Sequence, residues 1–433
     1  MTGLPLEKVR VISLTEVYAG PYATSLLGDM GAEVIHVEAI QRVAQGRGQL
    51  NPVPGGQGNY ADNDPGTRPW ERSAGFNYNH RNKKGITLNL TDPKGIAVFK
   101  ELVQLSDIMV DNYASGTMER MGIGYEVVSK WNPAIIMLSS SGWGGDGPYK
   151  GYISYGSHVD ATIGHTYLRG YPDLDPSRTT SIVHSDSITG PAVVFGAMTA
   201  LKYRMRTGKG QFVDLAQAEA FMPHLGNFIM DYTMNGRVAQ PVGNRDHTMA
   251  PHGVYRCAGN DRWATIAVRN DEEWRALCKA IGRPELAGDE RYADVISRLQ
   301  RQDELDQIIR EWTVDKDSHD VMNHLQKAGV PAGLVMKDDD VWHDPHLRAR
   351  NFFQMVTHRE AGTHEYTKSP WRLDGKPLEI RLPATCLGEY NYEVYRELLG
   401  KTAEEYQQME DEKLIGDTYV EGAEVSPRDR DVT

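Results

Sequence analysis

The start of the chain carries the pattern of two buried strands joined by a helix, and this pattern constrains the fold most. The apolar run Val9–Leu14 predicts a strand. A helix is predicted from Pro21 to about Met30, because proline suits a first helical turn and Gly31 stands where helices often end. Glu33–Val37 predicts a second strand. A β-α-β unit joins parallel strands through a right-handed crossover, so the sequence predicts a parallel sheet.

The alternation of strands and helices continues to about residue 140 and then changes. Further strands are predicted at Gly85–Leu90, Asp107–Val110 and Ala134–Leu138, with helices over 92–104 and 125–130. From about Leu225, a hairpin pattern over 253–268 precedes amphipathic helices over 271–281, 289–300, 303–312 and 318–326 and a strand at Val330–Val335.

This change of pattern predicts an α/β protein with two domains. The larger domain contains an open, mostly parallel, Rossmann-like sheet and is expected to comprise residues 1–224 and 340–433. Residues 225–339 are expected to form a smaller α+β domain.

Composition excludes several classes of protein. The net charge of −12 argues against general nucleic-acid binding. No apolar run approaches the roughly 20 residues that span a bilayer, and residues 1–11 do not resemble a secretory signal. The cysteines Cys257, Cys278 and Cys386 are far apart, so neither a metal site nor a disulfide framework is expected. We therefore expect a cytoplasmic protein that binds neither membrane nor metal.

The strongest candidate for a reactive side chain is Asp186. It is predicted on a loop before an apolar, small-residue segment that reads as a buried helix. The turn Thr207–Gly210 and a strand at Gln211–Leu215 follow. A carboxylate at the mouth of a packed helix is costly unless it is hydrogen-bonded or used in chemistry. The ordinary alternative is that Asp186 caps the helix.

Several motifs occur in an order that resembles the class III CoA-transferases, the CaiB/BaiF family. They include AGP at Ala19–Pro21, GAEVIHVE at Gly31–Glu38, SDIMVDNYASGTMERMGIG at Ser106–Gly124, the Asp186 segment with TGKGQFVDL, HDP at His343–Pro345 and LGEYN at Leu387–Asn391. The resemblance covers about 390 residues. It implies a dimer whose two subunits interlock like links of a chain, either a homodimer or a hetero-oligomer with a related subunit.

The resemblance implies that Asp186 is a covalent nucleophile. A carboxylate is ionised at pH 7 and needs no adjacent base. Its attack on an acyl-CoA thioester gives a mixed anhydride, the released thiolate then forms an aspartyl-CoA thioester, and an acceptor acid reverses the sequence. Acyl-CoA and a carboxylic acid are then the substrates, with no permanently bound cofactor. Succinyl-CoA is a common donor in the family.

Residues that match the family's CoA contacts come from several segments. They are Val17, Tyr18 and Ala19 at the AGP motif, Leu88 and Thr91 as a weaker match, Asn112 and Tyr113, Arg120 with the adjacent Met121, and Tyr155. An arginine fork fits a phosphate group, which favours Arg120 as a phosphate contact.

The chain departs from the family member that acts on formyl and oxalyl groups. That member has glutamine where Tyr18 stands, arginine where Ala39 stands and glutamate where Gly156 stands. Formyl transfer is therefore not expected. Tyr18, together with Trp143, Tyr149, Tyr152 and Tyr155, suggests a pocket for a bulky or aromatic acid, although such aromatics also pack in ordinary cores.

Two other functions stay open. The α-methylacyl-CoA racemases are a related class that places a histidine in the segment corresponding to Gly151–Gly156, and this chain has none there. His184 lies two residues before Asp186 in the sequence, so racemase activity stays an alternative. A non-catalytic CoA-binding subunit is the other alternative, and the presence of Asp186 argues against it. The run Gly142–Gly147 satisfies G-x-G-x-x-G, but Pro148 and a loop follow it, so we expect an active-site loop and no nicotinamide site.

Overall fold

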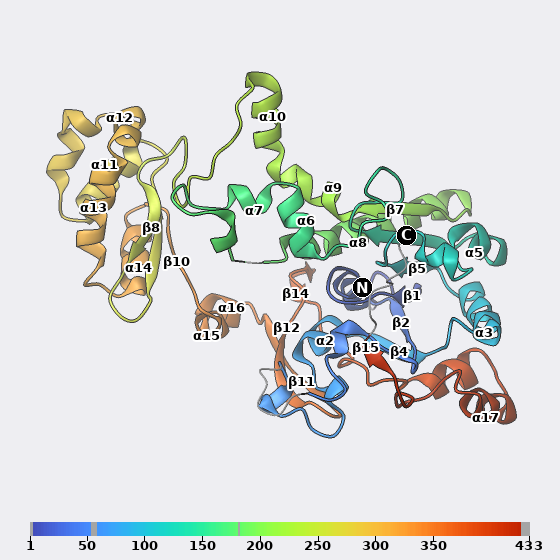
Figure 1. Ribbon diagram of the computed structural model, residues 1–433. Helices are drawn as coiled ribbons and strands as arrows, with labels where there is room; N and C mark the ends of the chain where they lie inside the picture. The colour runs from blue at the N-terminus through green and yellow to red at the C-terminus, as the bar shows by residue number, and fades with distance from the viewer. Residues whose placement is uncertain (1–2, 53–58, 181, 426–433) are drawn as a thin grey trace. The chain divides into compact units, whose positions relative to one another are not determined.

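The computed structural model describes residues 3–52, 59–180 and 182–425 (Figure 1). The chain divides into two compact units. The first unit comprises Met1–Ile163, Ser181–Met230 and Arg348–Thr433. The second comprises Gly164–Thr180 and Asp231–Leu347.

The first unit is built on a six-stranded parallel sheet. Its strands, in spatial order, are β4 (Lys83–Thr87), β2 (Glu33–Glu38), β1 (Arg10–Leu14), β5 (Ile108–Asp111), β6 (Ile136–Ser141) and β7 (Phe212–Ala216). This is the strand order of a Rossmann fold, so the predicted parallel sheet is confirmed. The direction of strand addition reverses between β1 and β5, and ligands of such sheets bind at the carboxyl ends of the strands at this point.

One strand lies earlier in the chain than expected. The structure ends β4 at Thr87, whereas the sequence placed the strand at Gly85–Leu90. Beyond Thr87, the N–H of Asn89 donates to the carbonyl of Leu414, 2.8 Å away, in the C-terminal segment. The apolar run therefore continues past the strand because Leu88 and Leu90 enter the hydrophobic core.

Helices cover both faces of the sheet. On one face, α3 (Pro93–Gln104), α5 (Tyr125–Trp131), a π-helix (Glu393–Leu398) and α17 (Ala403–Asp411) pack on strand residues such as Ile12 and Met109. On the other face, α1 (Ala19–Asp29) and α8 (His184–Thr207) pack on alternate strand residues such as Val11 and Val110. The C-terminal segment, red in Figure 1, thus completes the core that the N-terminal strands begin.

The helices α1 and α8 approach each other closely. At Gly190 of α8, an added Cβ would stand 2.4 Å from the ring of Tyr22 of α1. Their facing side chains, among them Ala23, Leu27 and Ala197, are fully buried. The first turns of both helices are therefore held side by side, which positions the candidate site.

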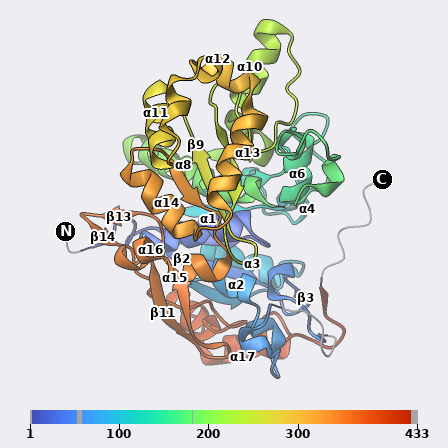
Figure 2. The same ribbon diagram turned by 90° about the vertical axis from the view of Figure 1, so that its left-hand side faces the viewer.

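The second unit has its own core. The antiparallel strands β8 (His252–Arg256), β9 (Trp263–Ala267) and β10 (Ala332–Leu334) pack against α11 (Asp271–Ala280), α13 (Gln302–Thr313) and α14 (Ser318–Lys327) (Figure 2). The helix expected over 289–300 is divided. A 3₁₀ turn precedes Asp294, whose carboxylate accepts a hydrogen bond from the N–H of Ser297 and begins the short α12 (Val295–Gln300).

Further helices and strands, apart from 3₁₀ turns, complete the two units. They are β3 (Arg42–Val43), α2 (Ala74–Asn79), α4 (Thr117–Arg120), α6 (Gly156–Thr162), α7 (His165–Leu168), α9 (Gln217–Phe221), α10 (Gly226–Asn235), α15 (Asp338–His343), α16 (Pro345–Ala349), β11 (Phe353–His358), β12 (Gly362–Thr367), β13 (Arg372–Leu373), β14 (Lys376–Pro377) and β15 (Glu424–Val425). Within the described ranges, no helix has both the length and the apolar character needed for a membrane crossing. All three cysteines are buried thiols.

Candidate active site

Asp186 lies inside α8 rather than on a loop before it, which corrects the sequence expectation. The helix begins at His184, so Asp186 belongs to its first turn and does not cap it. The preceding residue, Val183, supplies no capping side chain. Asp160 of α6 does so from a distance, since its carboxylate accepts hydrogen bonds from the N–H groups of His184 (3.2 Å) and Ser185 (3.0 Å). The helix therefore starts earlier than local sequence suggested.

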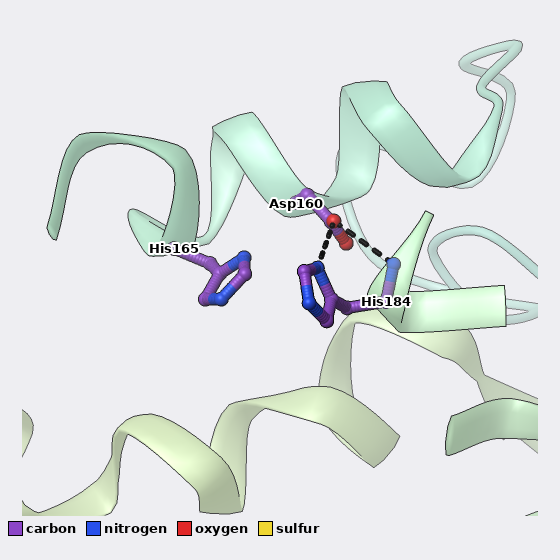
Figure 3. Close-up of side chains that lie close together, drawn as sticks. All are labelled: Asp160, His165 and His184. Atoms are coloured by element: carbon purple, nitrogen blue, oxygen red, sulfur yellow. Dashed lines mark hydrogen bonds and ion pairs between the residues drawn. The ribbon is translucent and has the colours of Figure 1, made fainter. Parts of the chain in front are cut away.

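Figure 3 shows how Asp160 meets the start of α8, with contacts to both the backbone and the ring of His184. The ring Nδ1 of His184 lies 3.6 Å from a carboxylate oxygen of Asp160. Asp160 is thus a close carboxylate neighbour of the His184 ring. The structure gives His184 a place at the helix start beside the reactive candidate.

Three segments of the first unit surround the carboxylate of Asp186. The side-chain amide of Gln217, at the start of α9, donates a hydrogen bond to Oδ1 over 3.1 Å. The backbone N–H of Ala19, at the start of α1, donates a second hydrogen bond. At Gly156 of α6, an added Cβ would stand 1.9 Å from Oδ2, so only glycine leaves room for this oxygen.

The surroundings of Asp186 make its ionised form less favourable than in water. Burial raises the pKa of this carboxyl group to about 6, and the negative charge of Asp160 adds to the rise. The hydrogen bonds from Gln217 and Ala19 act in the opposite direction. Most of the carboxylate is therefore ionised at pH 7, yet it is more basic than an exposed aspartate.

Val17 and Tyr18, predicted to contact CoA, lie in the turn between β1 and α1, and Ala19, also predicted, begins α1 and contacts Asp186. The Tyr18 hydroxyl hydrogen-bonds Ser187, and burial raises the pKa of this tyrosine. Val17 has a φ of 67°, a left-handed conformation that is unusual for a β-branched residue. Such strain persists only where surrounding contacts impose it, and it is common at binding sites.

Asn112 and Tyr113, also predicted CoA contacts, fix this same turn from the end of β5. The side chain of Asn112 accepts from the N–H of Glu16 (2.8 Å) and donates to its carbonyl (2.9 Å). The Tyr113 hydroxyl donates to the Glu16 carboxylate over 3.1 Å, and Arg42 pairs with that carboxylate. Glu16 and Arg42 were missed by sequence reasoning, because their partners lie on separate strands.

The remaining predicted contacts are more widely placed. Leu88 is buried in the core on the α3 face of the sheet, where Met121 also packs, whereas Asp186 belongs to a helix of the opposite face. The Thr91 hydroxyl donates to Asn89 over 2.7 Å. Arg120 donates to the Thr117 hydroxyl over 2.9 Å, and the Tyr155 hydroxyl donates to Gln45 over 3.2 Å. The structure thus joins the AGP turn to Asp186 but gives Leu88 and Met121 packing roles.

Gln217 and Asp160 are the other residues that sequence reasoning missed. Gln217 follows β7 directly, and the carboxyl ends of parallel strands meet at one edge of a sheet. A polar residue at such a strand end was the signal that could have identified Gln217. Asp160 had no comparable signal, since its role depends on α6 meeting α8.

The arrangement presents a half-buried carboxylate held by neutral donors at the ligand-binding edge of a parallel sheet. The model of CoA-transferase family III matches residues 6–391. The chain belongs to CoA-transferase family III. This match confirms the family assignment made from the sequence motifs.

Relatives of this family III member align along nearly all of the chain. A succinyl-CoA–D-citramalate CoA-transferase of Chloroflexus aurantiacus is 33% identical over 95% of this chain and 98% of its own. A succinyl-CoA–L-malate CoA-transferase alpha subunit from the same organism is 32% identical over 95% and 93%. A CaiB/BaiF family protein from Brucella suis has a similar structure, with a TM-score of 0.78 and 28% identity over 92% of this chain and 100% of its own.

Proposed function

We propose that this enzyme moves CoA from an acyl-CoA donor to a carboxylic acid through covalent intermediates on Asp186. The main support for this proposal is the environment of the Asp186 side chain. The carboxylate is half-buried, its hydrogen-bond donors are neutral, and burial raises its pKa to about 6. A more basic carboxylate is a better nucleophile, provided that it is still ionised at the working pH.

The reaction proceeds in two halves that conserve the thioester's free energy. Asp186 attacks the acyl carbon, the carbon–sulfur bond breaks, and CoA leaves as thiolate. The thiolate then attacks Cγ of Asp186, releases the donor acid and forms the aspartyl-CoA thioester. The acceptor carboxylate repeats these steps in reverse. Each intermediate hydrolyses in water, so the half-buried position of Asp186 protects them.

CoA is proposed to bind along the turn between β1 and α1. Val17 is exposed there with a left-handed backbone, and Ala19, two residues later, donates to Asp186. Arg120 is exposed at the end of α4, beside the same edge of the sheet, and its guanidinium suits a CoA phosphate. Tyr155, whose hydroxyl reaches Gln45, completes the proposed contacts.

Succinyl-CoA is the proposed donor, because two of the relatives are named for it. Those relatives are named for the acceptors D-citramalate and L-malate, which are short dicarboxylic acids. A short dicarboxylic acid is therefore the proposed acceptor class. The aromatic residue Tyr18 beside Asp186 supports the competing expectation of a bulky or aromatic acid. A panel of both acid classes, assayed with succinyl-CoA, decides between them by kcat/KM.

One experiment tests the covalent mechanism. The protein is incubated with succinyl-CoA, and the peptide containing Asp186 is examined by mass spectrometry for an acyl or CoA adduct, with Asp186→Ala as the control. An adduct together with CoA transfer supports the proposal. Deuterium entering the α-carbon of an acyl-CoA from solvent without any adduct indicates racemase chemistry instead. CoA binding with neither result indicates a non-catalytic subunit.

We also propose that the enzyme works as an oligomer, with a second copy of this chain as partner. The outer surface of α8 exposes large apolar side chains, including Phe195 (76% exposed) and Met205 (79%). One relative is named as an alpha subunit, which supports assembly with a related subunit as the alternative. Light scattering of the purified chain tests the proposal, and a monomer would contradict it.

A further inference from the structure

The side chain of Gln217 is fixed at the edge of the sheet. It begins α9 immediately after β7, where Ala216 pairs with Ser141 of β6. The N–H of the next residue, Ala218, donates to the carbonyl of Gly142 over 3.1 Å. Gln217 is itself 8% exposed. Its amide therefore approaches Asp186 from a rigid backbone and not from a mobile loop.

The two oxygens of Asp186 have different surroundings. Oδ1 accepts the hydrogen bond from the Gln217 amide, whereas Oδ2 lies against the Cα of Gly156, where no side chain stands. An oxygen engaged by an amide donor is the poorer nucleophile of the two. The geometry thus distinguishes Oδ1, which the Gln217 amide holds, from Oδ2, which packs against Gly156.

We propose that Gln217 is a catalytic residue, which binds Oδ1 of Asp186 and stabilises the negative charge that forms on this oxygen during CoA transfer. The inference rests on the proposed covalent function of Asp186. In the resting enzyme the same amide orients the carboxylate so that Oδ2 attacks the thioester.

The bond changes place charge on Oδ1 at two points. After Oδ2 has attacked the donor, Oδ1 is the carbonyl oxygen on the aspartyl side of the anhydride. When the CoA thiolate adds to Cγ, the carbonyl electron pair moves onto Oδ1, and it returns as the bond from Cγ to Oδ2 breaks and the donor acid leaves with Oδ2. The acceptor carboxylate then adds to the same carbon, Oδ1 becomes an oxyanion again, and thiolate is expelled. A hydrogen-bond donor that is already in place, such as the Gln217 amide, lowers the reaction barrier most when negative charge develops on the oxygen that it binds.

A purely structural role for Gln217 predicts different results. As a tether between α8 and α9, the hydrogen bond would affect folding stability and leave the chemistry of each folded molecule unchanged. The two roles separate in step-resolved kinetics and in the pH profile, because only the catalytic role couples Gln217 to the charge on Asp186.

The test compares Gln217→Met, which keeps the length but removes the donor, with Gln217→Glu, which keeps the shape and adds a negative charge. We expect Gln217→Met to slow formation and breakdown of the aspartyl-CoA thioester ~10²- to 10³-fold, with a small change in KM. Gln217→Glu should be slower still. Gln211→Met, about 20 Å away at the other end of β7, is the matched control.

The pH profile supplies a second readout. The hydrogen bond from Gln217 lowers the pKa of Asp186, so its loss should move the acidic limb of kcat/KM to higher pH. The other groups that act on Asp186, namely Asp160 of α6 and the N–H of Ala19, are unchanged in the Gln217 variants, as is Tyr18, whose own pKa the charge of Asp186 raises. In the trapped thioester, the carbonyl stretch of Asp186 should move to higher frequency in Gln217→Met, because its hydrogen bond is lost.

Rates within threefold of wild type, with an unchanged acidic limb and carbonyl stretch, would overturn the role of Gln217 and indicate a tether. If Gln217→Met does not fold, the isosteric Gln217→Glu carries the kinetic comparison. Failure of the proposed function is a separate result: wild-type protein then shows no adduct on Asp186 at all.

Discussion

Two regions of the first unit bury carboxylates, and they treat them in opposite ways. Near β2, Arg47 is fully buried and forms hydrogen bonds of 2.6 Å to both oxygens of Glu38 and to Glu71. The guanidinium also lies 3.8 Å from the ring centroid of Phe76. In the part of the chain that the structure describes, Asp186 has no such cation and is held by an amide and a backbone N–H.

The difference teaches how a buried acid becomes structural or reactive. Arg47 pairs with both Glu38 and Glu71, and Arg68 pairs with Glu71 as well, so these charges hold β2 to the segment before α2. Neutral donors orient Asp186 without neutralising its charge, so burial leaves the pKa of this carboxyl group raised. We therefore expect that removing Arg47 lowers the stability of the fold, and that removing the carboxylate of Asp186 lowers the activity.

The largest effect is expected from Asp186→Asn. CoA transfer should fall by at least about 10⁴-fold, because the nucleophile is lost. The same variant should also change stability. The pKa of Asp186 is higher in the folded protein than in the unfolded chain, so keeping this group ionised lowers the free energy of unfolding above about pH 6. Below about pH 4 the group is protonated in both states, and the effect disappears. The variant should therefore be more stable than wild type by about 2–3 kcal/mol at pH 8 and equally stable at acidic pH. Thermal melts across this range check the sign, and equal stability at pH 8 would contradict it.

Arg47→Met is expected to lower the stability of the fold, whereas Asp186→Asn is expected to raise it. Glu38 loses its arginine partner and Glu71 keeps only Arg68, which should destabilise the fold by about 3–5 kcal/mol, measured by urea unfolding. The exposed pair Arg291–Asp289 offers a matched control, because Arg291→Met should cost less than about 1 kcal/mol. A comparable loss in both variants would mean that burial does not distinguish the two ion pairs.

A smaller effect on catalysis is expected from Gly156→Ala. The new Cβ would collide with Oδ2 of Asp186, so the carboxylate must rotate out of position. We expect kcat to fall about 10- to 100-fold with little change in stability. Gly75→Ala is the control, since nothing lies within 4 Å of a Cβ added there. Full activity of Gly156→Ala would show that the position of Oδ2 does not matter.

The smallest effect is expected from Asp160→Asn. The charge of Asp160 raises the pKa of Asp186, so its removal should move the acidic limb of the pH–rate profile to lower pH by less than about one unit. The start of α8 also loses part of its cap, which should cost about 1 kcal/mol. A limb that moves upward would contradict the assigned influence of Asp160.

Sequence patterns predicted those parts of the fold that depend on local periodicity. The strands at Val9–Leu14 and Glu33–Val37 appear as expected, because each is a short segment rich in valine and isoleucine. The strand near Gly85 was placed too late in the chain. Leu88 and Leu90 extend the apolar pattern beyond the strand because they pack in the hydrophobic core after the strand has ended. The start of α8 was misplaced because its cap comes from Asp160, in another helix.

The sequence by itself determined the family, the parallel sheet and the identity of the candidate nucleophile, because motif order and hydrophobic periodicity are properties of the linear chain. Only the tertiary structure decided what surrounds Asp186. Gln217, Ala19 and Gly156 come from three distant segments, and the sheet and the packing of α1 on α8 bring them to one carboxylate. Hydrogen bonds and burial act over a few ångströms of space, whatever the separation along the chain.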